Sequence, residues 1–273
     1  MSAAIIELEG VAQEYRLARP APFMARPVLR VLDGIDLRLA QGEALGLVGE
    51  SGAGKTTLTR ILTAVERPAA GRILFRGTDL WAAGSDLLRE FRRSVQVVLQ
   101  NPRSSLDPRM RVGTALLEPM RALAIAGDHM ARLHEVAAKV GLPADALDRF
   151  PHEFSGGQLQ RIAIARALMP GPSVLIADEP VSALDVSIQA QVLNLLKDLV
   201  AALGLTLVLI AHDLSVVAYT TGRVAVMAGG RIVERGAPMD LFTRPEAEAT
   251  RALVDAVLTV ESGLRQRAEG RDG

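Results

Sequence analysis

Short apolar segments alternate with amphipathic ones along much of the chain. Residues 44–48 are apolar and lead into a glycine, and apolar residues recur at helical spacing from Lys55 to Leu62. Apolar segments without strict alternation recur at 174–177 and 205–210, as is typical of parallel strands with helices on both faces. Between them, residues 187–203 show helical spacing. The order strand, helix, strand predicts a mainly parallel α/β sheet.

Two segments lack strand patterns and predict helices. Residues 86–93 and 114–141 have helical patterns, so we expect a mostly helical lobe near residues 100–165. After an apolar segment at 224–227, closely spaced glycines predict a hairpin, followed by a helical tail whose last dozen polar residues are frayed.

Composition excludes several kinds of chemistry. The 273 residues contain 31 basic and 31 acidic side chains, so no global positive charge favours nucleic acid. Because there is no cysteine, disulfides, thiolate catalysis and cysteine-based metal sites are excluded. The first ten residues do not resemble a signal peptide, and we expect a cytoplasmic protein.

One segment matches a phosphate-binding loop at every defined position. The pattern G-x-x-x-x-G-K-[ST] occupies residues 49–56, between a predicted strand and a predicted helix. Its glycines let backbone N–H groups face phosphate oxygens, Lys55 would neutralise the phosphates, and the Thr56 hydroxyl would ligate Mg²⁺. A glycine-rich turn with a solvated lysine is disfavoured by this context. The loop residues are Gly49, Glu50, Ser51, Gly52, Ala53, Gly54, Lys55 and Thr56.

Two adjacent carboxylates end the predicted strand at 174–177. In enzymes with a phosphate loop, the strand-terminal aspartate, here Asp178, holds Mg²⁺. Glu179 is then available to orient and deprotonate the attacking water. An isolated Asp-Glu pair is more often a capping or solvated pair, but the phosphate loop favours the catalytic interpretation.

Residues 154–161, Phe-Ser-Gly-Gly-Gln-Leu-Gln-Arg, resemble the signature sequence of ATP-binding cassette (ABC) ATPases. Ser155, Gly156 and Gly157 precede a predicted helix, so they form a second candidate anion-binding helix N-terminus. The resemblance implies that these residues and Gln158 contact ATP bound to an opposing subunit. An ordinary serine N-cap is the alternative.

The same resemblance assigns further residues. Gln100 would contact Mg²⁺ and the attacking water, His212 would contact the γ-phosphate, and Tyr15 would stack on adenine, although packing alone would also explain an aromatic there. Thr57 belongs to the ATP-binding set. The loop that crosses the dimer interface would comprise Ser182, Ala183, Leu184 and Asp185.

The resemblance also implies the architecture. The fold would be α/β, a P-loop NTPase core with a mainly parallel sheet, an inserted helical subdomain and a small N-terminal antiparallel β subdomain. A single ABC ATPase domain would span residues 1–250, with a RecA-like core at 1–99 and 166–235 and a helical subdomain at about 100–165. Residues 236–273 would form a partly frayed helical tail.

Two longer segments, 100–110 and 181–191, look like the oligopeptide, dipeptide and nickel uptake branch of the family. That branch implies ATP and Mg²⁺ as cofactors, a second identical or homologous ATPase, two membrane permeases and an extracytoplasmic substrate-binding protein. The chain would lie peripherally on the cytoplasmic face of the inner membrane, with residues 104–110 exposed for permease docking. Many members of this branch carry a C-terminal cysteine cluster, which this chain lacks, so no role of that cluster transfers.

Two other classes of function are alternatives to a transport ATPase. DNA-repair and chromosome cassettes insert long coiled coils between the glutamine and the signature, whereas only a compact lobe fits between Gln100 and Ser155. A translation-associated protein would normally carry two cassettes in one chain. A scaffold that has lost hydrolysis is disfavoured because the catalytic residue types are retained. The sequence leaves the cargo open, and also the identity of the second cassette.

Overall fold

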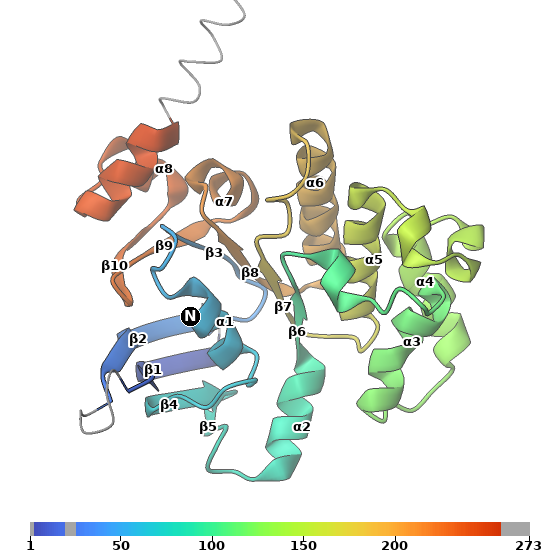
Figure 1. Ribbon diagram of the computed structural model, residues 1–273, viewed down its shortest axis with the longest axis horizontal. Coiled ribbons are helices and arrows are strands. Elements are labelled where there is room, and N and C mark those ends of the chain that lie inside the picture. The colour runs from blue at the N-terminus through green and yellow to red at the C-terminus, as the bar shows by residue number, and fades with distance from the viewer. Residues whose placement is uncertain (1–2, 20–25, 258–273) are drawn as a thin grey trace, which may run out of the picture.

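The computed structural model describes residues 3–19 and 26–257. Its central sheet has six strands in the order β10-β9-β3-β8-β7-β6 (Figure 1). The strands are β3 (Ala44–Gly49), β6 (Val95–Val98), β7 (Val174–Asp178), β8 (Thr206–Ala211), β9 (Arg223–Ala228) and β10 (Arg231–Gly236). All neighbouring pairs are parallel except β9–β10, which is the predicted hairpin. The fold class is therefore confirmed.

The central sheet is covered on both faces, which explains why its strands lack alternation. Every residue of β8 is buried. Val208 and Ile210 pack into one hydrophobic cluster, together with α1 (Lys55–Leu62) and the N-terminal sheet. Leu207 and Leu209 pack into a second cluster with α5 (Gly156–Leu168), α6 (Val186–Leu203) and α7 (Leu214–Thr220).

A separate antiparallel sheet lies against α1 (Figure 1). Its strands have the order β2-β1-β4-β5. They are β1 (Ala4–Arg16), β2 (Val28–Ala40), β4 (Ala70–Phe75) and β5 (Thr78–Asp79), and α2 (Ser85–Ser94) follows them. This sheet is the predicted N-terminal antiparallel unit.

The segment 114–141 is mainly helical, as predicted, and contains two helices. Helices α3 (Val112–Ala122) and α4 (His129–Lys139) are separated by a turn in which Ala124 and Gly127 have φ values of 49° and 121°. Asp128 caps α4 by accepting hydrogen bonds from two backbone N–H groups. Its position as an N-cap explains the break, because Asp favours that role over a helix interior.

Helix α6 is the one helix among those described that is long and apolar enough to cross a membrane by length and composition. Its buried residues, which include Val192, Leu196 and Leu199, face the core beside α5 and α7. Glutamines, Asn194 and Lys197 alternate with them along the helix. This amphipathic pattern is typical of a surface helix in a globular protein.

The C-terminal part contains α8 (Pro238–Thr243) and a helix at residues 248–257. Glu234 of β10 accepts hydrogen bonds from the N–H groups of Glu246 and Ala247, at 3.1 and 2.9 Å, and from the Thr250 hydroxyl. This side chain fixes the start of the last described helix to the hairpin. The predicted frayed tail beyond residue 257 lies outside the described residues.

Candidate functional site

The phosphate loop joins β3 to α1 in a conformation that needs glycine. Gly52 and Gly54 have φ values of 84° and 101°, and a Cβ atom on Gly54 would lie 2.9 Å from the Val31 carbonyl oxygen. A Cβ atom on Gly49 would collide with the Met227 carbonyl oxygen. Helix α1 has no side-chain N-cap, so its first N–H groups face an anion site without a competing acceptor.

Lys55 is held inside this loop. Only 8% of its surface is exposed, and its ammonium group donates to the carbonyl oxygens of Gly49 and Glu50, at 2.6 and 3.0 Å. Burial lowers the pKa of Lys55, while the nearby carboxylates of Glu179 and Asp178 oppose that shift. Backbone oxygens therefore position the Lys55 ammonium group. Because burial disfavours this positive charge, a bound phosphate would stabilise it by supplying the opposite charge.

Asp178 ends β7, and its environment is desolvated. Burial raises the pKa of Asp178, a hydrogen bond with the Thr59 side chain lowers it in part, and the neighbouring Glu179 carboxylate raises it. Glu179 follows in a left-handed backbone conformation with φ of 45°, and its N–H group donates to the Ile210 carbonyl oxygen at 2.9 Å. This conformation is uncommon for a residue that is not glycine, and it aims the Glu179 side chain from the end of β7.

Two polar side chains, those of Gln100 and His212, contact the Glu179 carboxylate. Gln100 Nε2 donates to Glu179 Oε2 at 2.8 Å and lies 3.3 Å from the Ser182 hydroxyl. His212 Nδ1 lies 3.5 Å from the same carboxylate oxygen. Gln100, Glu179 and His212 directly follow the ends of β6, β7 and β8, which are adjacent parallel strands. A carboxylate held in this way is suited to act as a general base toward a water in the cleft.

These residues line an open cleft of about 750 Å³. From the predicted set, it is lined by Ser51, Gly52, Gly54, Lys55, Thr56, Thr57, Gln100, Asp178, Glu179 and His212. Four further residues line the cleft and were not predicted as nucleotide-site residues: Val31, Leu99, Asn101 and Ser104. Asn101 and Ser104 could have been found from their position just after Gln100, but no local pattern points to Val31.

Tyr15 does not line this cleft. Its hydroxyl donates to Glu66 Oε2 at 2.9 Å, and its β1 position pairs with Leu29 of β2. The adenine-stacking role of Tyr15 stays a prediction.

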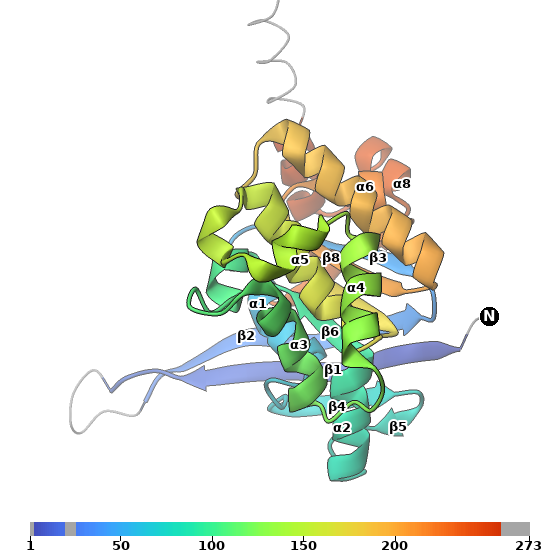
Figure 2. The same cartoon turned by 90° about the vertical axis from the view of Figure 1, so that its right-hand side faces the viewer.

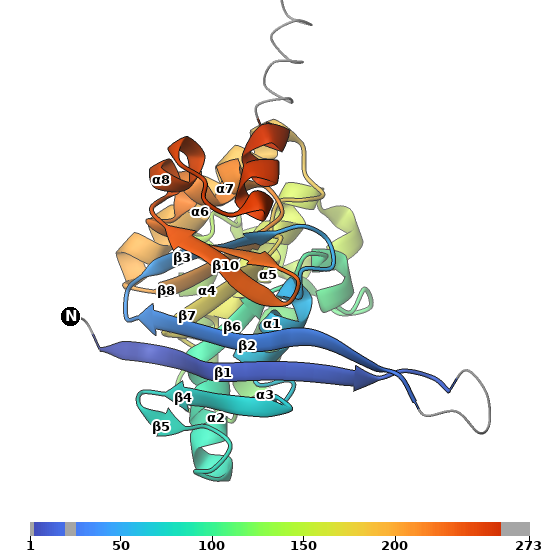
Figure 3. The ribbon, with the colours of Figure 1, turned by 90° about the vertical axis from the view of Figure 1, so that its left-hand side faces the viewer.

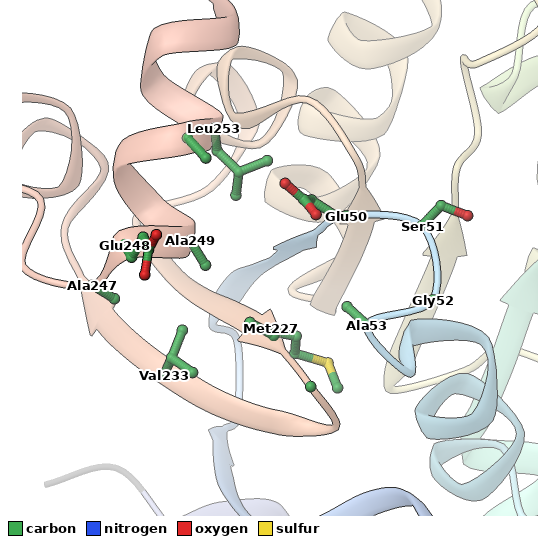
Figure 4. Close-up of a pocket in the computed structure, with 13 residues that line it drawn as sticks. Glu50, Ser51, Gly52, Ala53, Met227, Val233, Ala247, Glu248, Ala249 and Leu253 are labelled. Carbon is green, nitrogen blue, oxygen red and sulfur yellow. The ribbon is translucent and has the colours of Figure 1, made fainter. Parts of the chain in front are cut away.

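A second pocket, of about 570 Å³, lies on the other side of the phosphate loop (Figure 4). Glu50 and Ala53 line it together with Met227 and Leu253, so the helix at 248–257 forms one wall and the phosphate loop another. Four of the predicted ATP-binding residues therefore line this pocket: Glu50 and Ala53 line it alone, and Ser51 and Gly52 also line the cleft.

The signature residues are held at the start of α5. Ser155 is the N-cap: its hydroxyl accepts from Gln158 N at 3.4 Å, and its own N–H donates to Gln158 Oε1 at 3.0 Å, which forms a capping box. A Cβ atom on Gly157 would lie 2.5 Å from Ile188 Cγ2, and one on Gly156 would lie 3.1 Å from Leu184 Cδ2. Gly157 therefore permits the close approach of α6, whereas at Gly156 a small shift of the Leu184 side chain would make room for a Cβ atom.

The four signature residues do not line the ATP cleft of their own chain. Ser155, Gly156 and Gln158 are exposed, and so are Ser182, Ala183 and Asp185 of the predicted interface loop. Val186, the next residue, is 81% exposed. A second helix N-terminus, the one predicted to bind an anion, is thus presented to the outside of the chain together with an apolar residue.

Comparison with known proteins agrees with this arrangement. A family model described as ABC transporter matches residues 32–182. A dipeptide transport ATP-binding protein of Haemophilus influenzae is 43% identical over 93% of this chain and 78% of its own length. An oligopeptide transport ATP-binding protein of Salmonella typhimurium is 46% identical over 84% of this chain and 70% of its own length.

A solved structure, a dimeric post-hydrolysis state of the ATP-binding cassette MJ0796 bound to ADP and Pi, has a TM-score of 0.73. It is 26% identical and covers 85% of this chain and 98% of that one. The cleft, the signature and these similarities lead to one conclusion: the chain belongs to the ABC transporter family and is an ATP-binding, ATP-hydrolysing cassette.

Proposed function

We propose that this ATPase drives the uptake of peptides, nickel or a similar small solute through separate permease subunits. The names of the dipeptide and oligopeptide transport relatives support the importer assignment. The assignment of ATP hydrolysis rests on the Glu179 carboxylate, which accepts a hydrogen bond from Gln100 and lies close to His212 in the cleft.

The side chains have separate roles in this proposal. Lys55 and the N–H groups at the start of α1 bind the phosphates, and Glu179 accepts a proton from the attacking water. Gln100 orients that water, and His212 contacts the γ-phosphate. The short contacts among these three residues support their acting together.

We also propose that Mg²⁺ binds through Thr56, Gln100 and Asp178. Their donors are a hydroxyl, an amide and a carboxylate, which are the oxygen ligands that this hard cation prefers. Among the described residues, no group of three or more His, Cys, Asp or Glu could hold a metal ion. When bound, Mg²⁺ neutralises charge on the phosphates.

The signature would act on a second cassette, identical or homologous to this one. Its exposure outside the cleft supports a head-to-tail pair in which each signature covers the ATP of the other chain. Ser182, Ala183, Leu184 and Asp185 would cross the interface between them. The neutral charge balance offers no support for binding to nucleic acid.

The remaining partners and the location complete the proposal. Two permeases would contact the segment at 104–110, which is exposed at Ser104 and at 107–109, although Leu106 is buried, contrary to the expectation that the whole segment is exposed. An extracytoplasmic binding protein would deliver the solute. The cassette would lie on the cytoplasmic face of the membrane. We keep the division into a core at 1–99 and 166–235, a helical subdomain at about 100–165 and a tail from 236.

Reconstitution tests this proposal. The chain would be combined in proteoliposomes with the permeases encoded beside it, and ATP-dependent uptake of labelled dipeptides, oligopeptides and nickel would be measured. We expect uptake that is lost in Lys55→Ala, since that variant lacks the phosphate-binding cation. ATP hydrolysis without uptake of any of these solutes would contradict the importer assignment, and native ATP affinity in Lys55→Ala would contradict the site.

A further inference from the structure

The β1–β2 ribbon continues beyond the sheet to which it belongs. Strand β4 pairs with β1 only from Ile6 to Ala12, whereas β2 pairs with β1 as far as Arg16. The N–H group of Leu17 then donates to the Pro27 carbonyl oxygen at 2.9 Å, which extends the ribbon. An exposed two-stranded ribbon is only marginally stable by itself, so one of this length gains from a partner surface. We call its described outer residues, 16–19 and 26–30, the arm.

The arm carries both basic side chains and exposed apolar side chains. It contains no acidic residue, and its exposed apolar side chains are Leu17, Val28 and Leu29, at 44, 55 and 49% exposure. Arg30 is already paired with acidic side chains at its base. No described residue pairs with Arg16 or Arg26. Adjacent exposed apolar and unpaired basic side chains are characteristic of an interaction surface.

The arm projects from the face of the molecule that carries the ATP cleft. Figures 2 and 3 both show the β1–β2 ribbon extending past the body on the side where α1 begins. Val31, which directly follows the arm, lines the cleft. Any molecule that covers the cleft from outside therefore meets the arm as well.

We infer that the arm grips a second copy of this chain, against the segment at 144–153 that leads into its signature. This inference rests on the proposed head-to-tail pairing, in which the signature of one copy covers the cleft of the other. Because residues 144–153 directly precede the signature, the pairing brings that segment of the second copy to the rim of the cleft, where the arm begins.

The surface of this segment complements the arm in charge. Asp145 and Asp148 have side chains that are 72 and 85% exposed. Their nearest arginine nitrogens lie 3.9 and 3.8 Å away, so both carboxylates keep most of their contact with water. Arg16 and Arg26 of one copy would pair with these carboxylates of the other, and Leu17, Val28 and Leu29 would be covered. The position at the cleft rim favours this partner over an anionic lipid surface, which the same arm chemistry would also suit.

Charge reversal tests the pairing. The full-length chain carrying Glu179→Gln, which keeps ATP bound, would be sedimented with MgATP to measure the dimer dissociation constant. Adding Arg16→Glu and Arg26→Glu should weaken the dimer about tenfold, because two favourable contacts become repulsive. Adding Asp145→Arg and Asp148→Arg to that variant should restore the affinity.

The matched control is Arg89→Glu with Arg93→Glu on α2, which makes the same charge change and should leave the dimer unaffected. A dimer that the arm reversal leaves unchanged would overturn the inference about the arm alone. If no ATP-dependent dimer formed in any variant, the pairing of identical copies itself would be wrong. Loss of binding to phosphatidylserine vesicles, with the dimer unchanged, would assign the arm to lipid and overturn the inference.

Discussion

Gln100 Nε2 lies 2.8 Å from Glu179 Oε2, although the two residues are 79 positions apart in the sequence. They meet because β6 and β7 are adjacent parallel strands whose carboxyl ends share one edge of the sheet. The contact connects the start of the 101–111 segment to the catalytic carboxylate. A displacement of that segment by a permease would therefore change the position of Glu179 directly.

Replacing Glu179 tests the base. Glu179→Gln keeps the shape and the contact with Gln100 but removes the proton acceptor, so we expect turnover to fall by at least about 100-fold with ATP binding retained. Steady-state phosphate release and nucleotide affinity measure the two effects. Glu90→Gln, at an exposed glutamate of α2 that lines neither the cleft nor the second pocket, is the control. Native turnover in Glu179→Gln would refute the assignment.

Replacing Asp178 should have opposite effects on the stability of the chain and on MgATP binding. Burial raises its pKa, so the protonated form stabilises the folded state below the unfolded pKa, and this contribution is lost as the pH rises through the folded pKa. At pH 7 the buried charge therefore destabilises the nucleotide-free chain. Asp178→Asn should raise its Tm by a few degrees and weaken the further increase produced by MgATP. Calorimetry with and without MgATP measures both, and a lower Tm without nucleotide would contradict the account.

The stabilising contribution of the Glu234 carboxylate should be lost in acid. Burial alone raises its pKa, but hydrogen bonds from Thr250, Ala247 and Glu246 lower it overall. Its contribution is therefore present above the unfolded pKa and is lost as the pH falls through the folded pKa. Glu234→Gln should cost about 1–2 kcal/mol at pH 7, because hydrogen bonds to a charged group are stronger than neutral ones.

Limited proteolysis should cut the helix at 248–257 first in this variant, since Glu234 fixes its start. Glu246→Gln, an exposed change nearby, should leave both stability and cleavage unaltered. Equal stability of Glu234→Gln and the native chain across pH 4–8 would show that the cap is unimportant.

A side chain at Gly157, in the signature, should clash with α6. Because its Cβ would lie 2.5 Å from Ile188 Cγ2, Gly157→Ala should destabilise the chain by about 1–3 kcal/mol. Chemical denaturation measures the change, and adding Ile188→Ala should recover part of it through a coupling term. Gly222→Ala is the control, because a Cβ there meets nothing within 4 Å. A neutral Gly157→Ala would mean that α5 and α6 separate readily.

The sequence predicted the local parts of the site well, because each depends on neighbouring residues. The predicted strand and helix around the phosphate loop are confirmed as β3 and α1, and the strand before Asp178 is confirmed as β7. The hairpin after residue 224 is confirmed as well. Glycine spacing and apolar runs determine these elements without help from distant contacts.

Features that depend on distant contacts were not predictable. Val31 reaches the cleft only because β2 passes beside the phosphate loop, and Ile188 is close to Gly157 only because α6 crosses α5. The left-handed conformation of Glu179 has no sequence marker in a residue other than glycine. The sequence analysis predicted a mainly helical segment at 114–141 without dividing it; Gly127 and Asp128 mark the turn and the cap that separate α3 from α4.

The central claim is that Ser155, Gly156 and Gly157 act on the ATP of another cassette. The most direct measurement is a structure of the assembled transporter carrying Glu179→Gln with trapped MgATP. The account predicts the γ-phosphate of each cleft within hydrogen-bonding distance of the signature of the opposing cassette. Signature residues far from every phosphate in that assembly would contradict it.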